Sequence, residues 1–214
     1  MRGIRLQFIS GGSSILGGIA FAFLGAAWAI THGSTAINRQ AYWLGLGNLQ
    51  FSQLNIVYSV LFIIGLSAFW KMTVKENKWA ITGYRIAFVC LCLELVSQIL
   101  QYHIVSPIRD VEATVVTIGF LIFWLSWLLF SLGMVILGLS MRLHSKFYRI
   151  SFVLIGVFQL AAFCTEFFLI SLLYDSTSVW GVSVWDVILG SVKVPFSLVW
   201  MILGAKLLLD RKAI

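Results

Sequence analysis

Six apolar stretches, separated by short polar connections, dominate the chain. They cover residues 9–30, 54–71, 80–102, 115–141, 150–173 and 187–209. As an α-helix with a rise of 1.5 Å per residue, each is long enough to cross a hydrocarbon core of about 30 Å. The pattern predicts an all-α fold, an integral membrane six-helix bundle. Because no linker or internal repeat divides the chain, we expect residues 1–214 to form a single transmembrane helical domain.

Composition agrees with this prediction, since 60% of the residues are hydrophobic, 11% are charged and the mean hydropathy is +0.98. Soluble domains are far more polar. The beginning of the chain also resembles a secretory signal, with Arg2 and Arg5 before an apolar run and Ala27-Trp28-Ala29 as a cleavage motif. That run is longer than a signal and carries glycines suited to helix packing, so we expect it to be retained.

Basic residues alternate between connections, as in proteins that follow the positive-inside rule. One side carries Arg2, Arg5, Lys71, Lys75, Lys78, Arg85, Arg142, Lys146, Arg149, Lys206, Arg211 and Lys212, and the other carries only Arg39 and Arg109. The rule predicts that both termini are cytoplasmic. The net charge of +7 then indicates topology and contact with anionic lipid headgroups, and not a nucleic-acid partner.

Two glutamates and one lysine, Glu94, Glu166 and Lys193, interrupt the apolar stretches. A charge in hydrocarbon is costly, so such residues generally mark functional sites. Helical periodicity places each on a stripe of small or polar residues. The stripes are Gly83, Ala87, Cys90, Glu94, Gln98 and Gln101, with Phe88, Leu91, Leu95 and Ile99 opposite; Gly156, Gln159, Ala162 and Glu166; and Asp186, Gly190, Lys193, Ser197, Trp200 and Gly204.

The three charges are expected at one depth, about 9 to 12 Å below the outer surface, when residues are counted from the helix ends. The second helix adds Asn55, Tyr58 and Ser59 near that level. We therefore predict a polar pocket in the outer half, with ligand-binding or ion-binding residues Glu94, Glu166, Lys193, Gln98, Gln101, Asn55 and Tyr58. The first and fourth helices are predicted to be packing elements, from the small-residue seams Ser10, Ser14, Gly18, Ala22, Ala26 and Gly119, Ser126, Gly133, Ser140.

Two glutamates against one lysine would leave a net negative charge, so the site should contain a proton, a cation, a ligand amine or water. The alternative is a purely structural ionic cluster, in which both glutamates interact with Lys193 and share one proton. A Schiff base on Lys193, as in retinal proteins, is disfavoured because microbial rhodopsins have seven helices. Pro195 instead indicates a distorted outer half of the last helix.

No cofactor and no metal are expected. His32 and His103 share the outer side but lack a third ligand at a recognised spacing. Cys90 and Cys92 lie on different helix faces and, with Cys164, are interpreted as small packing side chains. No sequence motif of a catalytic site, a phosphate loop or a dinucleotide fold occurs, which argues against an enzyme.

Residues 132–162 carry Gly133, Gly138 and Leu139, the basic turn from Arg142 to Ile150, and then Gly156. This pattern, together with Arg85, resembles a bacterial domain-of-unknown-function family of small six-helix membrane proteins. Tyr148 stands where that family's turn usually has a proline. The resemblance implies a bacterial inner-membrane bundle and brings no catalytic residues with it.

The sequence thus predicts a multi-pass protein of the cell membrane that binds or transports a small or amphiphilic solute, with cations among the candidates. Glu94 and Glu166 would hold a cation or proton, and Lys193 would tune the pKa values of the two glutamates. The remaining predicted site residues would orient the ligand. A transport cycle in six helices would need a homodimer or a membrane protein partner. Alternatives are a non-catalytic accessory or scaffold subunit and, third, an intramembrane enzyme.

Overall fold

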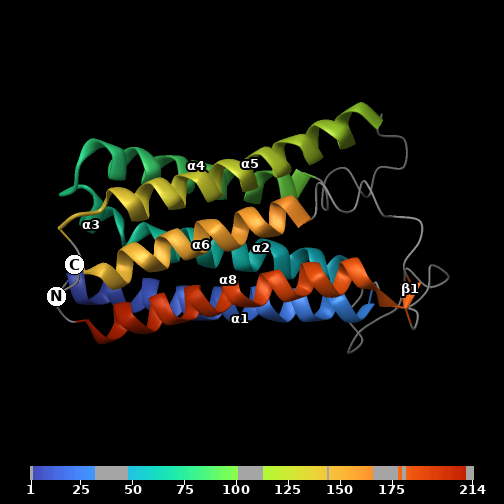
Figure 1. The fold of residues 1–214 in the computed structure, drawn as a ribbon, viewed down its shortest axis with the longest axis horizontal. Coiled ribbons are helices and arrows are strands. Elements are labelled where there is room, and N and C mark those ends of the chain that lie inside the picture. Colours follow the sequence, from blue (N-terminus) through green and yellow to red (C-terminus); the bar gives the residue numbers. More distant parts are fainter. Residues whose placement is uncertain are drawn as a thin grey trace.

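The computed structural model describes residues 2–31, 48–100, 113–143, 145–165, 178–179 and 182–210. Its helices are α1 (Arg2–Thr31), α2 (Asn48–Ser67), α3 (Trp70–Thr73), α4 (Lys78–Ile99), α5 (Ala113–Ser140), α6 (Lys146–Cys164) and α8 (Val184–Leu209). Two short strands, β1 (Ser178–Val179) and β2 (Val182–Ser183), pair antiparallel before α8. The predicted all-α bundle of six long helices is confirmed (Figure 1). The short helix α3 and the strand pair were not predicted.

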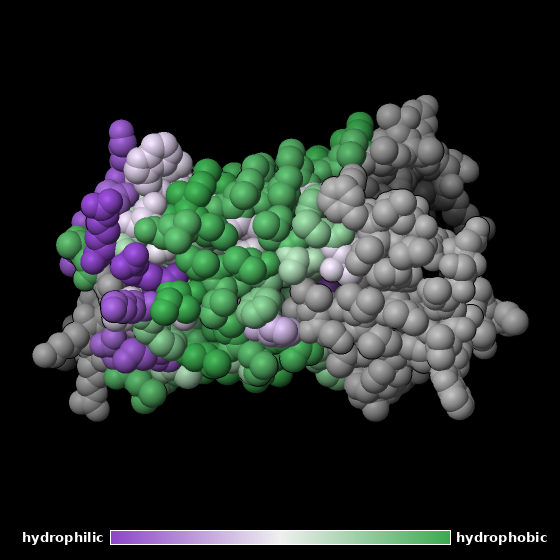
Figure 2. All heavy atoms as spheres, viewed as in Figure 1, coloured by the Kyte–Doolittle hydropathy of each residue, from purple (hydrophilic) through white to green (hydrophobic). Residues whose placement is uncertain are grey.

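Five segments of the described chain are long and apolar enough to cross a membrane. They are Leu6–Leu24, Gln53–Thr73, Lys78–Ile99, Leu121–Ser140 and Lys146–Cys164. Figure 2 shows the corresponding band of hydrophobic side chains beside a hydrophilic end. This arrangement is compatible with a multi-pass membrane protein. The expectation that residues 187–209 form a sixth span stays a prediction.

The six long helices form a closed ring. Each packs against the next along the chain, in the order α1, α2, α4, α5, α6 and α8, and α8 returns to pack against α1. At one end, hydrogen bonds join α1 to the end of α8. The Gln7 side-chain amide of α1 donates to the backbone oxygens of Leu207 (2.5 Å) and Asp210. The described chain therefore begins and ends at the same end of the bundle (Figure 1). That this end is cytoplasmic stays a prediction.

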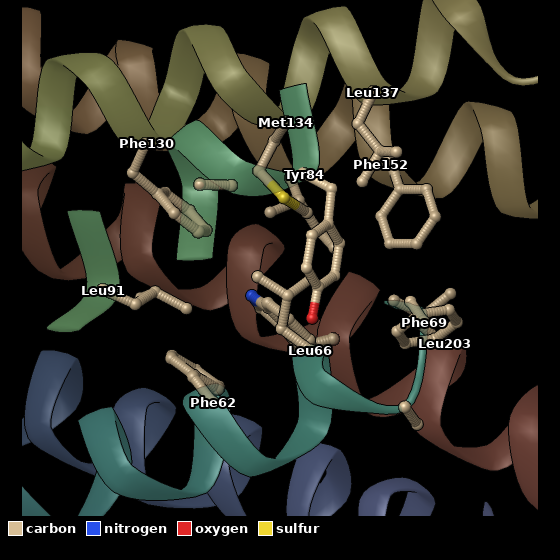
Figure 3. Close-up of a cluster of buried hydrophobic side chains, with 14 of the residues drawn as sticks. Phe62, Leu66, Phe69, Tyr84, Leu91, Phe130, Met134, Leu137, Phe152 and Leu203 are labelled. Atoms are coloured by element: carbon tan, nitrogen blue, oxygen red, sulfur yellow. The ribbon is translucent and has the colours of Figure 1, made fainter. Parts of the chain in front are cut away.

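Aromatic and aliphatic side chains fill the middle of the ring. Phe62 of α2 stacks on Trp200 of α8, with ring centroids 4.8 Å apart and planes inclined by 14°. Phe21 and Phe196 meet Phe62 edge-on. Figure 3 shows Leu66, Met134, Leu137 and Leu203 packed in the same core, and all four are fully buried.

Leu91 corrects one detail of the predicted helix faces. The sequence placed it opposite the polar stripe of α4, but it is only 2% exposed and belongs to the core. The reason is the helical repeat itself, because Leu91 follows Ala87 by four residues and precedes Glu94 by three, which places it beside both on the buried face. The outward face of α4 is formed by Val89, Leu93 and Val96.

Glycines hold neighbouring helices in close contact. Gly133 was predicted to lie in such a seam, whereas Gly11 was not, and Gly83 and Gly204 were assigned to the polar stripes of the site. A Cβ atom on Gly133 of α5 would lie 2.7 Å from the backbone nitrogen of Ala87 and 2.8 Å from the backbone oxygen of Gly83, both in α4. A Cβ on Gly204 of α8 would lie 2.6 Å from the backbone oxygen of Gly11 in α1. Since only hydrogen fits at such separations, these glycines allow backbone-to-backbone packing.

The turn before α4 is tied to the end of α5 by two adjacent side chains. The Glu76 carboxylate accepts hydrogen bonds from the backbone N–H groups of Arg142 (2.8 Å) and Leu143 (2.9 Å). Asn77 caps α4 by accepting from the N–H groups of Trp79 and Ala80, and it donates to the backbone oxygen of Ser140 at 2.7 Å. The pair therefore fixes how the α5–α6 turn lies against α4.

Replacing Glu76 with glutamine is expected to lower the free energy of unfolding by about 1–3 kcal/mol. The amide offers one oxygen where the carboxylate offers two, so one of the two partly buried backbone N–H groups loses its acceptor. Thermal unfolding in detergent measures the loss. Lys75→Gln, an exposed neighbour, is the control and should leave stability unchanged. Equal stability of Glu76→Gln and wild type would contradict the role given to the carboxylate.

Candidate functional site

Three buried polar side chains meet between α2 and α4. Tyr58 donates its hydroxyl proton to Glu94 Oε1 at 2.8 Å, and Gln98 Nε2 donates to the same oxygen at 3.1 Å. Gln98 Nε2 also lies 3.0 Å from the Tyr58 hydroxyl. Glu94 and Gln98 are one helical turn apart, so they share the face of α4 that looks into the ring. The carboxylate of Glu94 is thus held by donors from its own helix and from α2.

Ser59 extends this network on α2. Its hydroxyl lies 3.2 Å from Gln98 Oε1 and 3.0 Å from the backbone oxygen of Asn55. A hydroxyl has one proton, so it donates to one of these acceptors at a time. Asn55 enters the network through its backbone carbonyl, and the orienting role of its side chain stays a prediction. Ser59 was noticed on the polar face of the second helix but was not included among the predicted site residues.

Lys193 reaches the cluster from α8. Its ammonium nitrogen lies 5.7 Å from the ring centroid of Phe21 in α1 and 5.9 Å from that of Trp127 in α5. These distances allow cation–π attraction. Phe21 in turn packs against Tyr58, with ring centroids 4.7 Å apart, and Tyr58 donates to Glu94, so the ammonium group lies near enough to attract the carboxylate. The structure therefore brings together Glu94, Gln98, Tyr58 and Lys193, four of the residues that the sequence singled out.

Trp127 adds a buried donor beside the carboxylate. The side chain is 3% exposed, and its indole nitrogen has no hydrogen-bond partner of good geometry in the described part of the chain. It lies close enough to Glu94 to interact with the carboxylate. The hydrogen bonds from Tyr58 and Gln98 both end on Oε1. Among the described residues, the hydrogen bonds from Tyr58 and Gln98 therefore leave Oε2 and the indole N–H of Trp127 as neighbouring polar groups at the site.

Phe21 and Trp127 were missed by the sequence analysis. Both are aromatic residues within apolar stretches, and such residues occur throughout this chain. A weak signal existed for Trp127, because it follows Ser126 in the small-residue seam of α5. Nothing in the local sequence marks Phe21, whose contact with Lys193 depends on α8 returning to α1.

Two predicted site residues, Glu166 and Gln101, lie outside the described residues. Their convergence with Glu94 stays a prediction. Within the described part, the cluster has one carboxylate facing one ammonium group, so the predicted excess of negative charge depends on Glu166. Two other helix stripes do face the interior, since Gln159 and Ala162 of α6 and Ser197 and Trp200 of α8 are buried.

The described residues contain no group of three or more His, Cys, Asp or Glu side chains that could hold a metal ion. His32 and His103 lie outside them. Cys90, Cys92 and Cys164 are free thiols, buried, half-buried and exposed respectively. The cluster around Glu94 is therefore the candidate site that we consider further.

No protein-family model, curated protein or solved structure matches the chain. The resemblance of residues 132–162 to a family of small six-helix membrane proteins accordingly stays a prediction.

Proposed function

We propose that this chain is a multi-pass membrane protein that binds or transports a small or amphiphilic solute at Glu94. The observation that supports this proposal is the buried carboxylate itself, with hydrogen-bond donors on one oxygen and an indole N–H beside it. A purely structural ion pair is often replaceable by apolar packing. Intramembrane carboxylates with polar partners are more typical of ligand or proton sites.

The carboxylate of the cluster favours a ligand group that donates, such as an ammonium group or a hydroxyl. Either group would donate to Glu94 Oε2, and a hydroxyl could also accept from the indole N–H of Trp127. Tyr58 and Gln98 hold the carboxylate in place for that contact. A cationic ligand needs a second negative charge, because Lys193 already opposes Glu94. In this proposal Glu166 supplies that charge, and Gln101 and Asn55 help to orient the ligand.

The position of the site along α4 supports access from the outer side. Exposed basic residues at the opposite end of the bundle are Lys71, Lys75, Lys78, Arg142 and Lys146. In this proposal the positive-inside rule makes this end cytoplasmic. Glu94 follows Lys78 by 16 positions (94 − 78), or about 24 Å of helix, which supports a position in the outer half. We infer a location in a bacterial inner membrane from the same charge distribution and from the family resemblance.

The alternative of an accessory or scaffold subunit rests on small-residue seams available to partner helices. In the structure, the seams at Gly11, Gly83, Gly133 and Gly204 are used for contacts within the ring. This use removes the main argument for a scaffold, although Trp70 and Trp79 remain exposed. Solute binding is therefore the better supported proposal. If the solute is also transported, the proposal includes a homodimer or a membrane protein partner, because six helices alone would not complete a transport cycle.

A thermal-shift measurement in detergent tests the proposal with choline, octylamine and octanol as probes. Wild-type protein should be stabilised by an amine, by roughly 5–10 °C at 100 times the Kd. Glu94→Gln should abolish the shift, because the amide cannot oppose a cation. Glu76→Gln, which neutralises another buried carboxylate, is the matched control and should retain it. An equal shift in Glu94→Gln, or no shift with any probe, counts against solute binding.

A further inference from the structure

Arg85 lies on the outward face of α4 and inside a segment long and apolar enough to span a membrane. It is exposed, and the same face continues with Val89, Leu93 and Val96, which are also exposed. Arg85 follows Lys78, the first residue of α4, by seven positions (85 − 78), which is about 10 Å of helix. A charge at this depth on a lipid-facing surface is costly unless the side chain reaches toward the headgroups or binds an anion.

The side chain of Arg85 is supported by an aromatic ring. Its guanidinium carbon lies 5.9 Å from the ring centroid of Trp70, which is itself 37% exposed. Trp70 belongs to α3, so the contact joins α3 and α4 at the bundle surface. A ring face stabilises the cation but accepts no hydrogen bond in the plane of the guanidinium, where its five N–H groups point.

A second cation lies on the same face toward the end of the bundle. Lys78 is exposed, and its ammonium nitrogen lies 5.8 Å from the ring centroid of Trp79. The N–H groups at the start of α4 are already bonded to Asn77, so they are not available to an anion. We name Trp70, Lys78, Trp79, Thr82 and Arg85 the Arg85 surface.

The protein supplies little negative charge to this surface. Glu76 is the only acidic residue between Asn48 and Leu93, and its carboxylate accepts from the backbone of Arg142 and Leu143. Two cations, each beside an indole ring, therefore lie in the first turns of a helix that is long and apolar enough to span a membrane. This combination of charge, depth and adjoining apolar surface matches an anionic phospholipid.

We propose that the Arg85 surface binds the headgroup of an anionic glycerophospholipid from the leaflet at that end of the bundle. The guanidinium of Arg85 holds the phosphate through paired N–H groups, as arginine does with phosphate oxygens elsewhere. Lys78 adds a second charge toward the aqueous side, and the acyl chains lie along Val89, Leu93 and Val96. The site is independent of Glu94 and of the solute-binding proposal.

Native mass spectrometry of the detergent-solubilised protein tests this site with phosphatidylglycerol, phosphatidylcholine and inorganic phosphate as probes. Phosphatidylglycerol should bind more tightly than phosphatidylcholine. Arg85→Gln should weaken phosphatidylglycerol about fivefold, the factor for one lost contact between a basic residue and an anionic lipid. Trp70→Leu keeps the charge but removes the ring, and it should weaken binding by a smaller factor.

Lys146→Gln is the matched control, because Lys146 is an exposed basic residue at the same end, on α6. It should leave the affinity for phosphatidylglycerol unchanged. Equal weakening by Lys146→Gln would show general attraction by net charge and overturn the site. Equal affinity for phosphatidylglycerol and phosphatidylcholine would also overturn the site. Displacement of phosphatidylglycerol by inorganic phosphate at equal concentration would identify a soluble phosphate and exclude the lipid.

Discussion

Replacing Lys193 with methionine is expected to lower the free energy of unfolding by about 2 kcal/mol, measured by denaturant titration in detergent. Breaking a close, fully buried ion pair costs about 3–5 kcal/mol, because the remaining charge is left uncompensated. A smaller loss is expected here because Lys193 is only partly buried and its attraction acts on a carboxylate that Tyr58 and Trp127 also stabilise. Glu94, by contrast, is buried and keeps its donors Tyr58 and Gln98 in the variant.

A second substitution separates the charge from the shape of the site. Adding Glu94→Gln to Lys193→Met removes the uncompensated charge, so the double variant should regain most of the lost stability. The double-mutant cycle then gives the coupling between the two residues directly. If Lys193→Met is as stable as wild type, Glu94 holds no negative charge, and the electrostatic account of the cluster is wrong.

Replacing Gly133 with valine is expected to destabilise the protein by about 3 kcal/mol, the upper end of the range for overpacked sites. The added Cβ would meet the backbone nitrogen of Ala87 and the backbone oxygen of Gly83 at 2.7 and 2.8 Å. Backbone atoms cannot rotate away as a side chain can, so α4 and α5 must move apart. The apparent Tm in detergent and the yield of monodisperse protein both report the change.

Gly12→Ala is the control for this prediction. Nothing lies within 4 Å of a Cβ built on Gly12, which is also inside a helix. Alanine is the better helix former by about 1 kcal/mol, so this variant should be as stable as wild type or slightly more stable. A Gly133→Val variant that unfolds at the wild-type temperature would refute the close packing of α4 on α5.

The parts of the fold that could be predicted are those with a signal within one helix. The lengths of the apolar stretches gave the six helices, and three- and four-residue spacing placed Gly83, Ala87, Glu94 and Gln98 on one buried face. Opposite helix directions predicted that Glu94 and Lys193 lie at one level, and in the structure both lie beside Trp127. Each of these inferences needs only the helix repeat and the rise per residue.

What could not be predicted depends on contacts between helices. Val89 and Leu91 are both apolar, yet Val89 is 54% exposed and Leu91 is 2% exposed, a difference that the helical repeat indicates but the hydropathy of the two side chains does not. In a membrane protein, lipid and core accept the same side chains, so hydrophobicity does not tell one face from the other. For the same reason, neither Phe21 nor Trp127 was distinguishable from the other aromatic residues until three helices had been assembled around Lys193.

Closure of the ring by its first and last helices has a consequence for synthesis. Chains emerge from the ribosome with the N-terminus first, so α1 is made long before α8. Until then Gly11 and Gly18 lack the helix against which they pack, and Glu94 lacks the ammonium group of Lys193. The bundle is therefore expected to remain an open, chaperone-sensitive intermediate until its final 26-residue helix has been translated.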